Sequence, residues 1–203
     1  MCAIFGSFNV DKMKELAVLN SYRGSFSHSF TEFNLEKGIS NMCKGFGPVN
    51  TDGLKQKDNT FYIAHIQAPT GGMVDDFNRI HPATRGSKLL WHNGILKQSY
   101  LRDSGYSGWD TQYLIDVVVD WDILGSIDGS FSCLMIENKD LHLFRSQAAP
   151  MFFDDELNLS STKFEGSTST KEGIVYKVDL ENKSLSEIKT FQSKSNPYYL
   201  VNQ

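Results

Sequence analysis

The chain has few of the features that mark several large classes of protein. Its three cysteines, Cys2, Cys43 and Cys133, are an odd number without paired spacing, which argues against a disulfide framework and fits a reducing compartment. No dense run of lysine or arginine interrupts a net charge of −4, so the electrostatic footprint of a nucleic-acid-binding protein is missing. No apolar run approaches the roughly 20 residues of a membrane span, and the N-terminus lacks the basic and apolar regions of a secretory signal. We therefore expect a cytoplasmic protein with neither nucleic-acid nor membrane partners.

Motifs for metals and phosphates are missing as well. The five histidines show no ligand spacing such as His-x₃-His, and neither Cys43 nor Cys133 has a CxxC partner. Gly45-Phe46-Gly47 lacks the third glycine of a dinucleotide-binding loop, and the following Pro48 opens no helix. We expect no metal and no cofactor.

Two helices are predicted from hydrophobic periodicity. The first covers residues 11–22, with Asp11 as its cap and Gly24 after its end. The second covers residues 111–124, with Asp110 or Thr111 as its cap.

Short strands are predicted between and after these helices. Glycine-bearing turns close two of them, Gly71-Gly72 after one strand and Asn93-Gly94 after the next. A chain of 203 residues that is 40% hydrophobic can form one large domain, and this order of elements implies an α+β layered arrangement. The expected strands are residues 30–33, 61–66, 88–92, 131–136, 141–145, 151–153, 157–160 and 173–180.

Cys2 directly follows the initiator methionine. Removal of Met1, which is routine before a small side chain, leaves a cysteine with a free α-amine. The thiol can then attack a carbonyl while the amine, with an ordinary pKa of about 7.7–8.0, takes the proton at neutral pH. Cys2 is therefore a candidate N-terminal nucleophile. The alternative is a small buried hydrophobic residue that opens a first strand with Ile4 and Phe5.

Several short sequence blocks follow one another in a distinctive order. The five more specific blocks are Cys2-Ala3-Ile4-Phe5-Gly6, Tyr22-Arg23-Gly24, the segment 64–70, His81-Pro82 with Trp91-His92-Asn93-Gly94, and Trp109-Asp110-Thr111-Gln112. Less specific ones follow at residues 127–132, 143–146 and 159–161. In this order the blocks resemble the glutaminase domain of class II (N-terminal nucleophile) glutamine amidotransferases, a family that includes glucosamine-6-phosphate synthase, glutamine phosphoribosylpyrophosphate amidotransferase and asparagine synthetase.

The resemblance implies a fold and an activity. The fold is a four-layer αββα sandwich of the N-terminal-nucleophile hydrolase type, in a single domain over residues 1–203. The motif blocks occupy residues 2–165, and closing strands and a tail occupy 166–203. The activity is hydrolysis of the side-chain amide of glutamine through a thioester on Cys2.

The resemblance also assigns roles to individual residues. The Asn93 side-chain amide and the Gly94 backbone N–H would hold the oxyanion, because preorganised donors stabilise the charge that develops on an attacked carbonyl. Arg23 would brace the nucleophile, and Asp110 would bind the α-ammonium group of the substrate. From the residues alone, Asn93-Gly94 is also a common turn pair, Asp110 a helix cap and Arg23 a surface charge.

Position 67 departs from the family pattern. Family members usually have an arginine there that binds the α-carboxylate of glutamine, and this chain has Gln67. Three alternatives follow. Gln67 binds the carboxylate more weakly, with help from Thr70 and from Arg79 or Arg85; or the substrate lacks a free α-carboxylate; or activity has been lost.

The length of the chain bears on the partners that the resemblance implies. Large relatives fuse this domain to an acceptor domain that uses the ammonia, and only about 40 residues follow the matched blocks here. The resemblance therefore implies a separate synthase or acceptor protein. Two other functions stay open: an N-terminal-nucleophile amidohydrolase on another linear or peptide amide, and a catalytically silent binding or regulatory protein, which a retained Met1 would favour.

Overall fold

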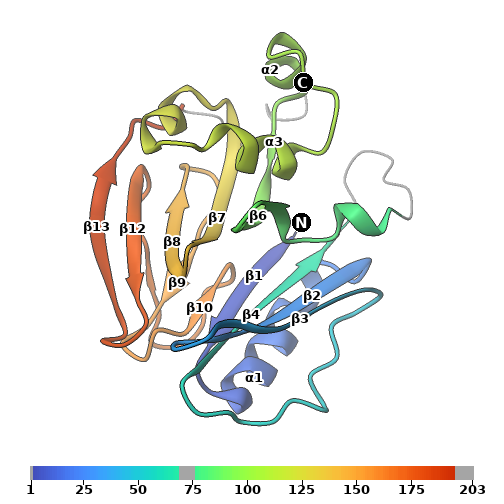
Figure 1. The fold of residues 1–203 in the computed structure, drawn as a ribbon, viewed down its shortest axis with the longest axis vertical. Helices are drawn as coiled ribbons and strands as arrows, with labels where there is room; N and C mark the ends of the chain where they lie inside the picture. The colour runs from blue at the N-terminus through green and yellow to red at the C-terminus, as the bar shows by residue number, and fades with distance from the viewer. Residues whose placement is uncertain (1, 69–75, 195–203) are drawn as a thin grey trace. The chain divides into compact units, whose positions relative to one another are not determined.

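The computed structural model describes residues 2–68 and 76–194. The chain forms two compact units, each assembled from three segments (Figure 1). The first unit comprises Met1–His81, Met151–Thr170 and Asp179–Ser184, and the second comprises Pro82–Pro150, Lys171–Val178 and Leu185–Gln203. Each unit contains one antiparallel sheet with helices, so the expected α+β class is confirmed.

The first unit contains a seven-stranded sheet with the order β11-β9-β10-β1-β4-β2-β3. The helix α1 (Val10–Asn20) packs against one face of this sheet through Met13 and Leu16. Because side chains alternate along a strand, Ala3 and Phe5 join that core while Ile4 between them faces the other side. The strands are β1 (Ala3–Ser7), β2 (Ser27–Asn34), β3 (Gly38–Phe46), β4 (Thr60–Gln67), β9 (Phe152–Phe153), β10 (Leu159–Ser160) and β11 (Thr168–Ser169).

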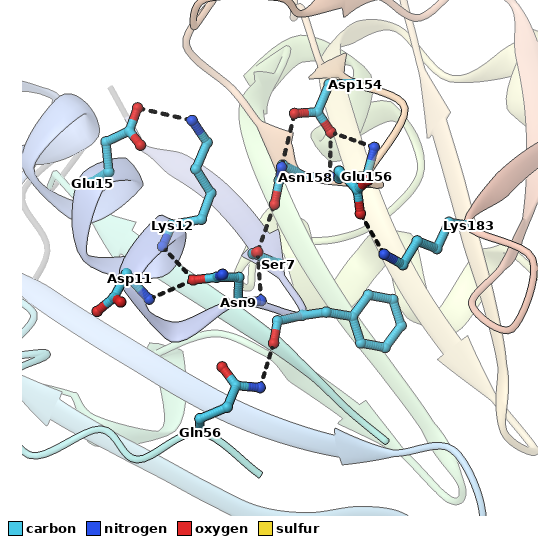
Figure 2. Close-up of a pocket in the computed structure, with 11 residues that line it drawn as sticks. Ser7, Asn9, Asp11, Lys12, Glu15, Gln56, Asp154, Glu156, Asn158 and Lys183 are labelled. Carbon is cyan, nitrogen blue, oxygen red and sulfur yellow. Dashed lines mark hydrogen bonds and ion pairs between the residues drawn. The ribbon is translucent and has the colours of Figure 1, made fainter. Parts of the chain in front are cut away.

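Helix α1 differs from the prediction at both ends. Its cap is Asn9, whose side-chain oxygen accepts from the backbone N–H of Asp11 at 2.8 Å and of Lys12 at 3.0 Å (Figure 2), so the prediction of Asp11 as the cap was wrong. The α-helix ends at Asn20, and the chain continues as the 3₁₀ turn η1 (Ser21–Arg23). This turn ends immediately before Gly24, as expected from the sequence.

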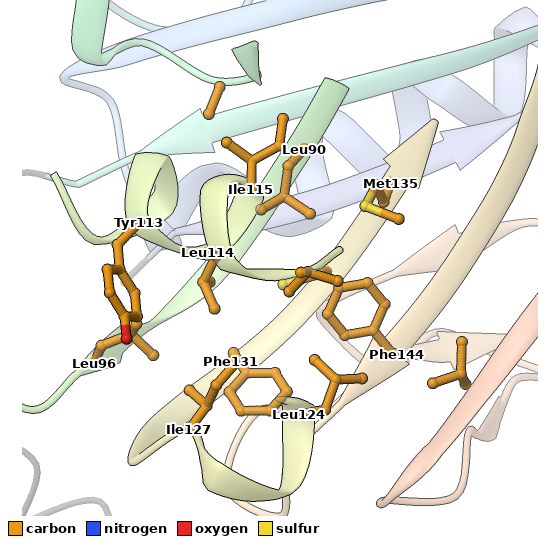
Figure 3. Packing of buried hydrophobic residues seen from close by; sticks show 14 of the residues in the cluster. Leu90, Leu96, Tyr113, Leu114, Ile115, Leu124, Ile127, Phe131, Met135 and Phe144 are labelled. Carbon is orange, nitrogen blue, oxygen red and sulfur yellow. The ribbon is translucent and has the colours of Figure 1, made fainter. Parts of the chain in front are cut away.

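The second unit contains a six-stranded sheet with the order β13-β12-β8-β7-β6-β5. The helices α2 (Gln98–Asp103) and α3 (Asp110–Val117) and the 3₁₀ helix η3 (Trp121–Ser126) contribute Leu101, Leu114 and Leu124 to its core. Figure 3 shows Leu114 and Leu124 in this core. Phe131 and Phe144 enter that core from the sheet. The strands are β5 (Ala83–Arg85), β6 (Lys88–Leu96), β7 (Gly129–Glu137), β8 (Asp140–Arg145), β12 (Ile174–Asp179) and β13 (Ser184–Thr190).

The predicted helix over residues 111–124 is two separate helices. Helix α3 stops at Val117, at the start of three consecutive valines, where the N–H of Val119 closes a tight turn on the Val117 carbonyl at 2.8 Å. Asp120 then caps η3 by accepting from the N–H of Asp122 at 2.8 Å. The cap position of α3 is Trp109, without a side-chain cap hydrogen bond, so the prediction that Asp110 or Thr111 caps this helix was wrong.

One predicted turn is also wrong. Asn93 and Gly94 lie inside β6, paired with Ser132 and Phe131 of β7, rather than closing a strand at His92. The other predicted turn, Gly71-Gly72, lies outside the described residues. None of the described helices is long and apolar enough to cross a bilayer.

Candidate active site

Cys2 lies immediately before β1 and is half-buried. Its sulfur is 3.8 Å from the carbonyl oxygen of Ala68. Since Ala3 pairs with Ile66 across β1 and β4, residue 2 lies one step further along this register, opposite Gln67. The alternation of side chains places Cys2 on the sheet face opposite α1. The thiol therefore lies beside the end of β4.

Arg23 contacts the backbone of the candidate nucleophile. Its Nε donates to the carbonyl oxygen of Cys2 at 2.8 Å. The next residue, Gly24, packs against the end of β4, where a Cβ would lie only 2.6 Å from the nitrogen of Ala68 and the carbonyl carbon of Gln67. Only glycine fits this approach, and it brings the guanidinium of Arg23 next to residue 2.

Gln67 ends β4 with its side chain buried, at 3% exposure. The Ser27 hydroxyl donates to the Gln67 side-chain oxygen at 2.9 Å, and the two residues are directly paired across β2 and β4. The backbone N–H of Phe26 also donates to the Gln67 carbonyl at 3.0 Å. Sequence reasoning missed Ser27, because a single serine at the start of a strand carries no motif. Thr70 lies outside the described residues.

The two arginines considered as helpers of Gln67 carry ion pairs of their own. Arg79 Nε lies 3.4 Å from a carboxylate oxygen of Asp76. In the second unit, Arg85 donates to the Asp116 carbonyl and lies 3.7 Å from its carboxylate. Each guanidinium group is therefore paired with an acidic residue. The partner of Arg79 lies three positions before it in the sequence, and the partner of Arg85 lies in the same unit.

Asn93 and Gly94 occupy the middle of the β6–β7 pairing. Asn93 is 4% exposed and lies, by alternation, on the sheet face opposite the helical core. Gly94 has φ +153°, and a Cβ there would come within 1.9 Å of the Ser130 carbonyl oxygen. Glycine is required at this position because two strands approach each other closely, a reason that the sequence did not reveal.

His92 links β6 to the start of α3. Its Nδ1 lies 3.2 Å from the Thr111 hydroxyl and its Nε2 lies 3.3 Å from the Ser130 carbonyl oxygen. A carbonyl can only accept, so Nε2 carries the proton and Nδ1 accepts from Thr111. Burial lowers the pKa of His92, and the negative charge of Asp110 only partly offsets this effect. The imidazole is therefore neutral at pH 7.

Asp110 belongs to the same network. One carboxylate oxygen accepts from the backbone N–H of Leu96 at 3.3 Å, and the other lies 3.5 Å from the Thr111 hydroxyl. The contact with Leu96 ties the first turn of α3 to the end of β6. Asp110 is thus held beside the strand that carries Asn93 and Gly94.

The structure groups the predicted residues into two sets, one in each unit. Cys2, Arg23 and Gln67 lie together in the first unit. Asn93, Gly94 and Asp110 lie on adjacent elements of the second. Within residues 2–68 and 76–194, no three His, Cys, Asp or Glu side chains are grouped in a way that could hold a metal ion.

Of the comparisons with known proteins, the one with solved structures finds similar chains. No protein-family model matches the chain, and no curated protein matches it in sequence. Among solved structures, glutamine phosphoribosylpyrophosphate amidotransferase from B. subtilis, complexed with ADP and GMP, superposes with a TM-score of 0.62 over 92% of this chain at 17% identity. The chain has the fold of this amidotransferase. A structure described as the allosteric regulatory enzyme of purine biosynthesis gives the same TM-score and coverage at 16% identity.

The shared fold confirms the resemblance inferred from the motif blocks and the α+β class expected with it. The likeness covers 49% of each of the two solved structures, so this chain spans about half of their length. At this level of identity the likeness establishes the fold, and the chemistry has to be argued from the residues.

Proposed function

We propose that the chain is a stand-alone glutaminase or amidotransferase domain, which hydrolyses the side-chain amide of glutamine through a thioester on Cys2. The observation that carries this proposal is the position of Cys2 in an amidotransferase fold. Its thiol lies 3.8 Å from the Ala68 carbonyl and its own carbonyl is held by Arg23. A thiol at the start of the chain, beside a buried strand end, suits a nucleophile whose base is its own α-amine.

The proposed reaction has two stages. The α-amine of Cys2 takes the thiol proton as the sulfur adds to the amide carbon, and the amide side chain of Asn93 and the N–H of Gly94 stabilise the oxyanion. The carbon–nitrogen bond then breaks, and the leaving nitrogen takes the proton from the α-ammonium group and departs as ammonia. A water molecule, deprotonated by the same amine, cleaves the thioester and releases the acid.

The amino-acid end of the substrate is the second part of the proposal. Asp110 has a carboxylate fixed on the N–H of Leu96, and we assign it to the α-ammonium group. Gln67 and Thr70 are assigned to the remainder of that end. Arg23 acts on the nucleophile through the backbone of residue 2 and is a positioning residue.

The remaining proposals concern the setting of this activity. Free glutaminase activity wastes ammonia, and we therefore propose that a separate synthase or acceptor protein receives it. We also propose that residues 1–203 act as one catalytic domain and that the protein works in the cytoplasm.

Release of ammonia from glutamine tests the proposal. The protein is produced with its natural start, and wild type is compared with Cys2→Ala and with Cys43→Ala, a control that removes an exposed thiol on β3. We expect Cys2→Ala to abolish release and Cys43→Ala to retain it. Equal activity in Cys2→Ala and wild type, or no release by any form, would overturn the proposal.

A further inference from the structure

Ser132 carries a buried hydroxyl that makes no hydrogen bond in the part of the chain that the structure describes. The residue is 0% exposed and lies on β7, which pairs with both β6 and β8. Phe131 and Cys133, on either side of it, belong to the helical core, so the Ser132 side chain lies on the opposite face of the sheet. Burial of a hydroxyl without a partner is destabilising, and alanine would suit the resting structure equally well.

Two residues lie directly opposite Ser132 in the sheet. Asn93 pairs with it across β6 and β7, and Arg145 pairs with it across β7 and β8. Opposite residues of an antiparallel pair share one face and have Cβ atoms about 4.5–5.5 Å apart, so their side chains can reach each other. The neighbours on this face of β7, Ser130 and Leu134, are two residues away along the strand, about 7 Å. Asn93 and Arg145 are therefore the side chains best placed to meet the hydroxyl.

Of these two residues, only Asn93 can accept the proton of the Ser132 hydroxyl. A guanidinium group has no acceptor, and Arg145 donates to the backbone carbonyls of Ser146 and Gln147 at 3.1 and 3.3 Å. The Asn93 side chain has a carbonyl oxygen, and its amide makes no hydrogen bond within residues 2–68 and 76–194. The last torsion of an asparagine side chain is broad, so the amide can turn in place. The hydroxyl and the amide can therefore form a hydrogen bond that the resting structure does not contain.

The proposed chemistry requires one orientation of the Asn93 amide. An oxyanion is stabilised by donors, so the NH₂ group of Asn93 has to face it and the side-chain oxygen has to point elsewhere. We infer that Ser132 is the positioning residue of Asn93: when substrate binds, its hydroxyl donates to the Asn93 side-chain oxygen and holds the NH₂ group toward the oxyanion. Both residues belong to the second unit. The inference rests on the proposed function and deepens it.

Substitutions of Ser132 test this role through the kinetics of ammonia release from glutamine, with Cys2→Ala as the background. We expect Ser132→Ala to lower kcat about three- to tenfold with KM within about twofold, because one neutral hydrogen bond to a transition-state donor is lost. Ser132→Cys fills the same space with only a weak donor, so its kcat should stay low as well. Wild-type kcat in Ser132→Cys would show that the serine only fills space, and would overturn the inference.

A double-mutant cycle with Asn93→Ala shows whether Ser132 acts through Asn93. Loss of the oxyanion donor in Asn93→Ala should lower kcat about 100-fold or more. In that background Ser132→Ala should change kcat by less than about twofold, because the amide that the hydroxyl positions is already gone. Effects of the two substitutions that simply multiply would give Ser132 a role independent of Asn93, and would overturn the inference.

Thr31→Val is the matched control for the loss of a buried hydroxyl. Thr31 lies on β2 of the first unit, is 0% exposed, and its hydroxyl likewise has no hydrogen-bond partner among the residues described. Neither Thr31→Val nor Ser132→Ala breaks a hydrogen bond of the resting protein, so the urea midpoints of both should match wild type. Thr31→Val should also keep kcat. A lower midpoint in Ser132→Ala alone would show that the hydroxyl stabilises the fold, and would overturn the inference.

The outcomes separate this inference from the proposed function. Ammonia release by wild type that Ser132→Ala retains in full, or a raised KM with unchanged kcat in that variant, overturns the inference alone. Failure of wild type to release ammonia from glutamine overturns the proposed function, and the inference with it.

Discussion

Substitution of Gly94 by alanine probes the point where β6 and β7 come closest. The new methyl group would lie 1.9 Å from the Ser130 carbonyl oxygen and 2.8 Å from the Nε2 of His92, whereas real Cβ atoms essentially never come within 3.0 Å of such neighbours. The strands must therefore move apart by more than 1 Å. Alanine must also adopt φ +153°, which L-residues rarely do.

The magnitude follows from these two effects. A rarely populated backbone conformation costs about 1–3 kcal/mol, and overpacking of a tight contact costs a further ~1–3 kcal/mol. The expected loss is therefore about 2–6 kcal/mol, against a total stability on the order of 5–15 kcal/mol. With a urea slope of about 2 kcal/mol/M, the unfolding midpoint should fall by on the order of 1–3 M. Activity at low urea should fall at least about 100-fold, because the proposed oxyanion donors are displaced.

Urea unfolding followed by tryptophan fluorescence measures this effect, and Trp91, a buried residue on the same strand, contributes to the signal. The control is Gly86→Ala in the turn before β6. Gly86 also has a positive φ, of +57°, but a Cβ there would meet no atom within 4 Å. The Gly86→Ala variant therefore isolates the cost of placing alanine at a positive φ, about 1–2 kcal/mol. If Gly94→Ala were as stable as Gly86→Ala, the reasoning from the Ser130 contact would be refuted.

Three further predictions concern other parts of the molecule. Arg23→Met removes the hydrogen bond to the Cys2 carbonyl, and we expect kcat for glutamine to fall about tenfold with an unchanged circular dichroism spectrum. An unchanged kcat would show that Arg23 does not position the nucleophile. Burial lowers the pKa of His92 in the folded state, so the unfolded state binds the proton first as pH falls. The free energy of unfolding should therefore decrease below about pH 6.5, by up to ~1.4 kcal/mol per pH unit. Urea midpoints measured from pH 7.5 to 5 should show this slope in wild type and a smaller slope in His92→Gln. Leu124→Ala should cost about 2–5 kcal/mol in thermal or urea unfolding, since Leu124 is fully buried in the core of the second unit, and a loss under 1 kcal/mol would contradict that packing.

The sequence predicted buried strands well and exposed ones poorly. The strand β4, which pairs on both edges, is a nearly continuous apolar run, and its predicted limits were one residue short at each end. The edge strand β3 was missed: most of its residues are exposed, its apolar residues do not alternate with polar ones, and a bulge at Glu32/Phe33 interrupts its pairing. The strand β13, which also lies at a sheet edge, was missed for the same reason. Pairing with one neighbour stabilises such strands without leaving a hydrophobic signal.

Local turn and cap preferences were misleading where tertiary contacts decide. Asn93-Gly94 is a favoured turn pair, yet the glycine is needed inside a strand for its approach to Ser130. Asn9 caps α1 in place of Asp11 because the helix starts at Val10, one residue before Asp11. Asp110 is tied to the N–H of Leu96, 14 residues before it, a contact that no local rule reveals.

In the candidate site, residues within sequence motifs could be predicted, and a residue that depends on strand pairing could not. Cys2, Arg23, Asn93, Gly94 and Asp110 were found through ordered motif blocks, and the amidotransferase fold supports that resemblance. Ser27 had no such signal, since its relevance depends on a cross-strand pairing between residues 40 positions apart. Partners that depend on register can be identified only when the sheet is known.

The most direct test of the central claim is the intact mass of the protein before and after incubation with a diazoketone analogue of glutamine. We predict that Met1 is absent from the purified protein, that one adduct forms, and that Cys2→Ala forms none. Retention of Met1 with no adduct would contradict this prediction and would favour a silent binding protein. An adduct of equal yield in Cys2→Ala would show that another residue is the nucleophile.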